Sequence, residues 1–411
     1  MFLILVTWLL TMVGHIGVWC VAFNRTHATA LPRRARKWME KVIILAVVLP
    51  IIGIVWTLVR TGDYSLFGDG LWNTSPPSFG YSLGCLIISP YFIIPWLRRK
   101  YGSQTVNGVK SHTRRWADID QNIAGGLTDG WLGNLFGKVP FNQATRLMVE
   151  EMEFEFEQLP KELDGLKIVQ LSDTHLTGQI RLEYFQAIVQ EANALEPDFV
   201  FITGDLVDEH ECLDWLEPFF GQLRARFGVY FILGNHDCRI KDQKSYRARL
   251  AENGMIAVGG EWHVVEVGGK QIAIAGNELP WFTGAEKLEL EPPQEVDFKI
   301  LLSHSPDQFQ WAQPYRFALM FAGHTHGGQI QLPLLGPLVA PSKFGVKYAS
   351  GTFMIDMMLM HVSRGISGDE SIRIDCPPEL GHFVLRHKAV ASQASDSQVK
   401  NASVDDPATV V

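Results

Sequence analysis

The sequence predicts an α/β globular domain that follows an N-terminal region of transmembrane helices. Two observations predict this fold class. Three apolar stretches lie within the first 100 of the 411 residues. Beyond them, short apolar runs alternate with helical patterns, and each run ends in a polar cluster. A chain of this length also exceeds one ordinary compact domain, so a division into parts is expected.

The apolar stretches are Phe2–Phe23, Val42–Val59 and Tyr81–Leu97. Each approaches the ~20 apolar residues that a helix needs to cross a bilayer. The third contains Pro90 and Pro95, so it either spans or forms a re-entrant segment. We therefore predict about three transmembrane helices.

The charge distribution separates a basic part from an acidic part. Residues 1–115 hold 13 Lys+Arg against 3 Asp+Glu, a net of +10; the whole chain is −8, so the remainder carries −18. An acidic globular part argues against nucleic acid as a partner, because such binding rests on basic residues that neutralise phosphates. The basic residues flank the first and third stretches, and this predicts a multi-pass cell-membrane protein with its globular part in the cytoplasm. If the third stretch does not span, the globular part lies outside.

The chain is expected to divide into a transmembrane region (1–100), a juxtamembrane connector (101–145), a globular domain (146–387) and a tail of disordered composition (388–411). One helical face within the connector is apolar, and it either rests in the membrane interface or covers the globular domain. That face comprises Trp131, Leu132, Leu135 and Phe136. Five cysteines without a CxxC pair predict no disulfide framework and fit a reducing compartment.

Metal-ligand residue types follow five of the apolar runs. In an α/β domain the carboxyl ends of the strands meet at one edge, so these side chains are expected to converge. They are Asp173, His175, Asp205, Asn235, His236, His304, His324 and His326. Two pairs have members two residues apart, which point the same way in extended backbone. Gly323, Gly327 and Gly328 let the last loop turn sharply.

The composition of this set indicates a dinuclear metal centre. A single histidine at a strand end is usually a surface or core residue, but five histidines with three Asp or Asn residues are not explained that way. Imidazole and carboxylate together suit divalent transition metals. The groups outnumber the ligands of one tetrahedral ion, whereas two ions that share a carboxylate fit. Such centres clamp both oxygens of a phosphoryl displacement.

The motifs, taken in order, resemble those of the calcineurin-like metallophosphoesterase superfamily over residues 146–386. They read Asp173-Thr174-His175, Gly204-Asp205-Leu206-Val207-Asp208, Gly234-Asn235-His236-Asp237, His304 and Gly323-His324-Thr325-His326. The segment after His326 and the later "HVSRGI…CPPEL" are similar to a membrane-associated bacterial phosphodiesterase branch, which includes UDP-2,3-diacylglucosamine pyrophosphatases.

The resemblance implies a four-layer α/β/β/α sandwich and two divalent metal ions, either Mn, Fe or Zn. It implies that Asp173, His175 and His326 bind one ion, that Asn235, His304 and His324 bind the other, and that Asp205 bridges them. A hydroxide between the ions then attacks phosphorus. His236 is implied to be a catalytic residue that donates a proton to the leaving oxygen, and Asp208 to orient it.

Lys343 and Arg364 follow the ligand segments, and each either grips a substrate phosphate or is an ordinary surface cation. Trp281 either lines an entrance or packs a loop. Cys238 is expected to be a buried structural thiol.

The sequence as a whole predicts a membrane-anchored, metal-dependent phosphoesterase that hydrolyses phosphodiester or pyrophosphate bonds. Its expected partners are membrane lipids and a small-molecule or lipid-linked phosphoester, such as a nucleotide-linked lipid. The alternatives are a catalytically silent membrane scaffold with the same fold and a protein phosphatase. The complete set of ligand types favours the enzyme. The sequence does not predict an oligomeric state.

Overall fold

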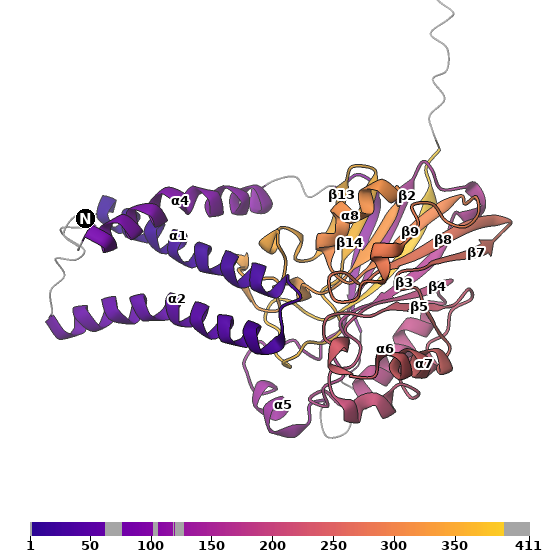
Figure 1. Cartoon of the computed structure of the whole chain (residues 1–411), viewed down its shortest axis with the longest axis horizontal. Helices are drawn as coiled ribbons and strands as arrows, with labels where there is room; N and C mark the ends of the chain where they lie inside the picture. The colour runs from indigo at the N-terminus through magenta and orange to yellow at the C-terminus, as the bar shows by residue number, and fades with distance from the viewer. Residues whose placement is uncertain (1, 62–75, 102–105, 118, 120–126, 390–411) are drawn as a thin grey trace, which may run out of the picture.

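The computed structural model describes residues 2–61, 76–101, 106–117, 119 and 127–389 (Figure 1). The predicted disordered tail, 388–411, lies almost wholly outside these residues. Within them, long N-terminal helices project from one end of a mixed α/β body (Figure 1).

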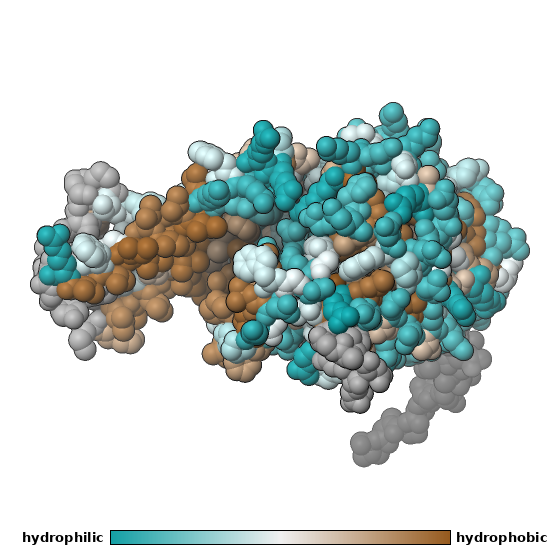
Figure 2. Space-filling model, turned by 90° about the horizontal axis from the view of Figure 1, so that it is seen from below, coloured by the Kyte–Doolittle hydropathy of each residue, from teal (hydrophilic) through white to brown (hydrophobic). Residues whose placement is uncertain are grey.

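Three long helices contain the three predicted apolar stretches. They are α1 (Phe2–His27), α2 (Arg33–Thr61) and α4 (Pro76–Tyr101). Among the described residues, the segments 5–27 and 78–101 are long and apolar enough to cross a membrane. The space-filling view shows their apolar surface beside the hydrophilic body (Figure 2). How many of the helices span remains a prediction.

The third stretch is one continuous helix despite its two prolines. Pro90 has no N–H, so it cannot bond the carbonyl of Leu86 one turn earlier. The Ser89 hydroxyl donates to that carbonyl instead, at 2.9 Å. Replacement of the lost bond by a side-chain hydroxyl is a usual way to keep a proline within a membrane helix. The third stretch is therefore a single helix, and whether it spans the membrane stays a prediction.

Small residues bring α1 against α4. A Cβ added to Gly14 would lie 1.9 Å from the carbonyl oxygen of Cys85, and one added to Gly17 would lie 2.4 Å from the Phe92 ring. Close backbone approach at glycine is how helices associate in lipid, where no hydrophobic effect drives them together. These two glycines therefore set the distance between the helices.

We predict that Gly14→Leu separates α1 from α4 and lowers the melting temperature of the detergent-solubilised protein, because overpacking typically costs about 1–3 kcal/mol. Gly84→Leu on α4 is the matched control, since a Cβ there meets nothing within 4 Å. Thermal unfolding of the two variants is compared with wild type. Equal melting temperatures for both would contradict the packing role.

A seven-stranded sheet forms one half of the body. Its order is β1-β2-β15-β3-β4-β5-β6. Strands β3 to β6 are parallel, and helices α6 and α7 lie in two of their connections. The bounds are β1 Val109–Trp116, β2 Met148–Phe156, β15 Glu379–His387, β3 Lys167–Leu171, β4 Phe199–Thr203, β5 Val229–Ile232, β6 Met255–Ala257, α6 Leu182–Ala194 and α7 Gln243–Glu252.

A six-stranded sheet faces it, with the order β13-β14-β10-β9-β8-β7. Strands β14, β10, β9 and β8 are parallel, and the two edge strands are antiparallel. The bounds are β13 Gly351–Ile355, β14 Met358–Val362, β10 Leu319–Ala322, β9 Phe298–Ser303, β8 Lys270–Asn277 and β7 Trp262–Val267. A small hairpin, β11 (Gln331–Leu332) with β12 (Gly336–Pro337), follows β10.

Three apolar cores define the layers. Phe201 and Phe321, from opposite sheets, meet in the core between the sheets. Ile188 of α6 packs on the outer face of the first sheet. Phe309 of the short helix α8 (Phe309–Ala312) packs on that of the second. This confirms the predicted four-layer α/β/β/α arrangement behind a helical N-terminal region.

The predicted connector is partly built into the body. Strand β1 pairs with β2 along its length, and its basic side chains meet glutamates of β2. Arg114 lies 3.2 Å from Glu150, and Arg115 lies 3.3 Å from Glu151. The sequence analysis did not identify this strand, because its partner strand is distant in sequence and β1 has too little alternation to be recognised alone. Further along, Gly130–Phe136 forms the short helix α5.

Candidate metal centre

The five predicted strand ends converge at one edge of the two sheets. β3, β4 and β5 supply ligands from the first sheet, and β9 and β10 supply them from the second. The ligand atoms form two groups in which all atoms lie within 4.8 Å of one another, and Asp205 belongs to both. The groups are Asp173, His175, Asp205 and His326, and Asp205, His304 and His324. This is the division that the resemblance implies.

Distances within the groups support a shared carboxylate. Asp205 Oδ2 lies 3.3 Å from His304 Nε2 and 3.6 Å from His175 Nε2. Asn235, the remaining predicted ligand, lies with its Oδ1 3.1 Å from His304 Nε2. The structure thus brings all seven predicted ligands together, and their division between two ions remains our prediction.

Hydrogen bonds orient three of the imidazoles. His304 Nδ1 donates to the Thr203 carbonyl at 2.8 Å, and His326 Nδ1 donates to the Ser367 carbonyl at 3.2 Å. His175 Nδ1 donates to Asp208 at 2.6 Å. Each bond engages Nδ1, so Nε2 is the ring atom directed at the centre, as in metal-binding histidines.

Two of the buried ligand atoms accept no hydrogen bond from the protein, namely Asp205 Oδ2 and His324 Nε2. A buried acceptor without a donor is costly, and a cation supplies what the protein does not. The donor set, nitrogen and carboxylate oxygen, suits divalent transition metals. The residues present therefore fit the two metal ions that the resemblance implies.

The backbone at the ligands is left-handed rather than extended. The φ angles of Asp173, His175, Asp205, His324 and His326 lie between 42° and 70°. Our expectation that the paired ligands point the same way because they lie in extended backbone is therefore wrong. Each is turned into the centre by a positive φ, which costs about 1–3 kcal/mol for a residue other than glycine.

Two glycines allow the loops to meet. A Cβ added to Gly323 would lie 1.9 Å from Ser172 Oγ, and one added to Gly234 would lie 2.3 Å from Asp205 Oδ1. The His324 N–H, next to Gly323, donates to both oxygens of Asp173 at 3.0 and 3.1 Å. The opposing sheets are thus joined by a direct contact at the centre.

Electrostatics raise the pKa of two of the imidazoles, whereas burial lowers the pKa of His324 and His326. Burial alone would lower the pKa of His175, but the Asp208, Asp205 and Asp173 carboxylates outweigh it and raise that pKa to about 10. The pKa of His304 rises to about 9 in the same way, against burial and through Asp205. Both imidazoles are therefore charged at neutral pH until a metal displaces their protons.

We predict that metal affinity rises with pH between 6 and 9. Binding must release protons from His175 and His304, whose pKa values in the folded protein are about 10 and 9. Two released protons give up to about 100-fold tighter binding per pH unit. Titration calorimetry with Mn²⁺ in buffers of different ionisation enthalpy counts the protons. A pH-independent affinity would show that these histidines are not ligands.

Asp208 has more hydrogen-bond partners than the sequence analysis assigned to it. It accepts from His236 Nδ1 at 2.5 Å, as the resemblance implies, and also from His175 Nδ1 and Arg239. Burial would raise its pKa, but the two imidazoles hold the pKa well below its usual range. Both histidines point N–H groups at it, so this trio is a hydrogen-bonded brace and not a third metal site. Arg239 in turn pairs with Asp369 at 3.1 Å.

We predict that Asp208→Asn weakens metal binding about 10–100-fold as well as slowing catalysis, because it loosens the ligand His175 as well as His236. Metal content after dialysis and kcat are the two readouts. Arg239→Gln is the comparison, since it removes one partner of Asp208 and leaves both imidazoles held. Full metal retention in Asp208→Asn would confine Asp208 to orienting His236.

Arg364 lies next to the loop that carries His326, rather than among the candidate metal ligands. Its guanidinium is 2.5 Å from Glu150 and 3.4 Å from Glu379, and its side chain packs under Gly327. These contacts give its predicted substrate role no support. Lys343 is exposed, and its backbone N–H donates to Asp307. Its role stays a prediction.

Other side chains are placed differently from expectation or were not foreseen. Cys238 is exposed, so the prediction of a buried thiol is wrong. The Trp281 ring lies 4.8 Å from that of His324, in a tilted arrangement, and 5.3 Å from that of His304, edge to face, centroid to centroid. Arg373 is fully buried and donates to the carbonyls of Ser367 and Cys376. It supports the segment that holds His326, and no local pattern marks it in the sequence.

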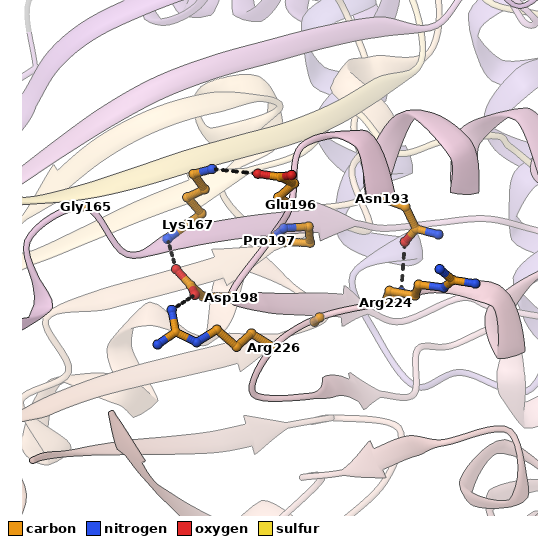
Figure 3. A pocket seen from close by; sticks show the side chains of 9 residues that line it. Gly165, Lys167, Asn193, Glu196, Pro197, Asp198, Arg224 and Arg226 are labelled. Carbon is orange, nitrogen blue, oxygen red and sulfur yellow. Dashed lines mark hydrogen bonds and ion pairs between the residues drawn. The ribbon is translucent and has the colours of Figure 1, made fainter. Parts of the chain in front are cut away.

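A hollow lies at the opposite, amino ends of β3 and β4 (Figure 3). Four of its charged side chains form two ion pairs: Arg226 lies 3.3 Å from Asp198, and Lys167 lies 3.9 Å from Glu196. The hollow contains none of the candidate ligands, so we do not regard it as a reaction site.

Comparison with known proteins agrees with the geometry. The family model "Calcineurin-like phosphoesterase" matches residues 166–328. An uncharacterized metallophosphoesterase of Aquifex aeolicus is 30% identical over 255 residues, covering 59% of this chain and 93% of that protein. UDP-2,3-diacylglucosamine pyrophosphatase LpxG of Chlamydia trachomatis is 25% identical over 279 residues, covering 54% of this chain and 85% of that protein.

A transmembrane protein with metallophosphoesterase domain from Danio rerio is 30% identical over 235 residues, covering 52% of each chain. The chain thus spans about half the length of this relative. Together with the two candidate membrane helices, it supports membrane association. The chain belongs to the calcineurin-like phosphoesterases, and its enzyme class is that of hydrolases acting on phosphoric ester bonds.

Proposed function

We propose that the protein is a membrane-anchored phosphoesterase that hydrolyses a phosphodiester or pyrophosphate bond in an amphiphilic substrate, for example a nucleotide-linked lipid. The observation that carries the chemistry is the shared carboxylate Asp205 between two buried ligand groups. Divalent cations bound there would supply Lewis-acid stabilisation of the phosphoryl oxygens and a nucleophile made from water at neutral pH.

His236 is the residue we assign to the leaving group. Its Nδ1 is held by Asp208 at 2.5 Å, so Nε2 is the ring atom available to the substrate. As the phosphorus–oxygen bond breaks, a protonated Nε2 donates its proton to the departing oxygen, and Asp208 stabilises the imidazolium. The His236 N–H also donates to Asp205 Oδ1 at 2.7 Å, which fixes its backbone against the centre.

The contacts between helices and body support a site that opens towards the membrane. Asn24, near the end of α1, is buried and accepts from the Ala340 N–H at 2.9 Å. Arg99, near the end of α4, donates to the Val346 carbonyl at 3.1 Å. Both contacts fall in the segment that follows the ligand His326. Figure 1 shows the end of α1 reaching the body.

The apolar face of α5 supports the interfacial interpretation made from the sequence. Trp131 and Leu135, one turn apart, are 75% and 53% exposed. Figure 1 shows α5 on the side of the body from which α1 and α2 project. A substrate embedded in the bilayer is concentrated for an enzyme held beside it, whereas a diffusing substrate gains nothing from an anchor. LpxG, whose name assigns it a nucleotide-linked lipid, is a relative that fits this proposal.

We predict that the purified full-length protein holds about two metal ions per chain and hydrolyses bis-p-nitrophenyl phosphate until chelator is added. It should prefer a lipidated UDP-sugar to its deacylated counterpart in vesicles. Activity that persists without metal would reject the metalloenzyme. Equal kcat/KM for the two UDP-sugars would reject the lipidic substrate, and a carboxyl-terminal reporter active only outside the cytosol would reject the orientation.

We predict that His236→Ala keeps the metal content of wild type while kcat falls by roughly 10²–10⁴-fold. The loss should be smaller with p-nitrophenolate as leaving group than with an alkoxide, because a good leaving group needs no proton. His326→Ala, which removes a candidate ligand, is the comparison and should lose metal. Loss of metal from His236→Ala would instead make His236 a ligand.

A further inference from the structure

The hairpin of β11 and β12 carries a cluster of leucines on the protein surface. Its strands pair Gln331 with Pro337 and Leu332 with Gly336. The side chain at its tip, Leu334, is 80% exposed, and three neighbouring leucines are also exposed. These are Leu332, Leu335 and Leu338. Contiguous exposed apolar side chains on one small element indicate a surface for a partner.

The backbone at the tip adds a second observation. Leu334 has a φ of 69°, in the left-handed region that leucine adopts only at a cost in free energy. Glycine or asparagine would relieve the strain. An exposed leucine side chain makes few contacts within its own chain, so such contacts do not offset the backbone strain. Contact with a partner outside the chain would account for an apolar side chain at this position.

The tip lies at the end of a candidate membrane helix. The Lys100 ammonium, in the last turn of α4, donates to the Leu334 carbonyl at 3.4 Å. The same ammonium lies 5.0 Å above the ring of Trp96. Tryptophan beside basic residues at the end of an apolar helix is typical of the membrane–water interface. The leucines are therefore at the depth where a bilayer would have its headgroups.

The hairpin also contacts the loop that carries the candidate ligand His326. A Cβ on Gly328 would lie 2.5 Å from Pro337 Cβ, and the Gln331 side chain donates to the Gly327 carbonyl at 2.9 Å. These two glycines follow the candidate ligand His326 directly. An interaction that fixes the position of the hairpin therefore also fixes the loop that carries His326.

We propose that the hairpin Gln331–Pro337 inserts its leucines into the boundary between headgroups and acyl chains of the leaflet in which α4 ends. It places the rim of the metal centre at the level of lipid phosphates. The inference rests on the proposed function, since it assumes that α4 enters a bilayer. A bilayer is favoured over a second copy of the chain because the surface is continuous with α4 and bordered by its terminal basic residues.

The first experiment measures depth without using activity. Leu334→Cys is made together with Cys238→Ser, which removes the exposed thiol, and is labelled with an environment-sensitive fluorophore. The full-length protein is reconstituted in vesicles. We expect quenching by lipids that carry a shallow nitroxide and protection from aqueous iodide. Leu290→Cys is the control, because Leu290 is exposed and its neighbour Glu291 pairs with Lys299 at the amino end of β9, whereas the candidate ligands lie at the carboxyl end.

Equal quenching by iodide at the two positions would overturn the inference. A label at position 334 that is shielded from both quenchers, together with a doubled particle mass, would assign the surface to a second copy and would also overturn it. Neither outcome depends on catalysis.

The second experiment tests the consequence for the reaction. Leu334→Asn with Leu335→Gln removes the apolar tip, and asparagine accepts the positive φ, so folding is retained. We expect hydrolysis of bis-p-nitrophenyl phosphate within twofold of wild type and about a tenfold loss on the lipidated UDP-sugar in vesicles. Leu290→Asn should change neither rate.

The failures of the two proposals are distinguishable. Wild-type protein that hydrolyses neither substrate contradicts the proposed function. Wild type and the tip variant with equal rates in vesicles contradict the hairpin inference and leave the phosphoesterase assignment standing.

Discussion

The metal centre depends on how its buried charges are balanced. Three carboxylates, Asp173, Asp205 and Asp208, lie almost fully buried at one edge of two sheets. Burying a charge is expensive unless it is paired, so each carboxylate requires cationic or N–H partners close by. Asp173 receives a backbone N–H, and Asp208 receives two imidazoles and a guanidinium. Asp205 accepts the His236 N–H on one oxygen, while its other oxygen accepts no hydrogen bond and faces His304 and His175. That second oxygen is where a metal ion would replace the protons of the two imidazoles.

The arrangement of the two sheets brings these charged groups together. Parallel strands bring five carboxyl ends to one edge, and the core between the sheets holds the two halves of the site at a fixed spacing. Asp173 of one sheet accepts from the backbone of His324 in the other. Movement of one sheet against the other would break this contact and separate the two ligand groups. The packing between the two sheets therefore helps to set the geometry of the metal centre, although it lies far from the ligands.

The sequence predicted the edge at which the ligands meet, because strand periodicity and residue type are local properties. It also predicted the layer order, through the resemblance. It did not predict the left-handed backbone at the ligands, since φ angles follow from tertiary contacts such as the bond from His324 to Asp173. It did not predict the ion pairs of Arg364, because Glu150 and Glu379 are distant in sequence. From the sequence the hairpin leucines are ordinary loop residues, because their position next to the end of α4 follows only from the tertiary structure.

The strained backbone at the ligands bears on how this protein can vary. Five ligand residues have positive φ, and glycine at any of them would relax the chain while removing a donor. Asp173 and His175, however, also satisfy buried partners, namely the His324 N–H and the Asp208 carboxylate. Removal of either side chain would leave a buried polar group without its hydrogen bond, which is costly. The gain from a relaxed backbone is therefore opposed by the loss of a buried contact, and the two ligands cannot be exchanged for glycine without disturbing the loops around them.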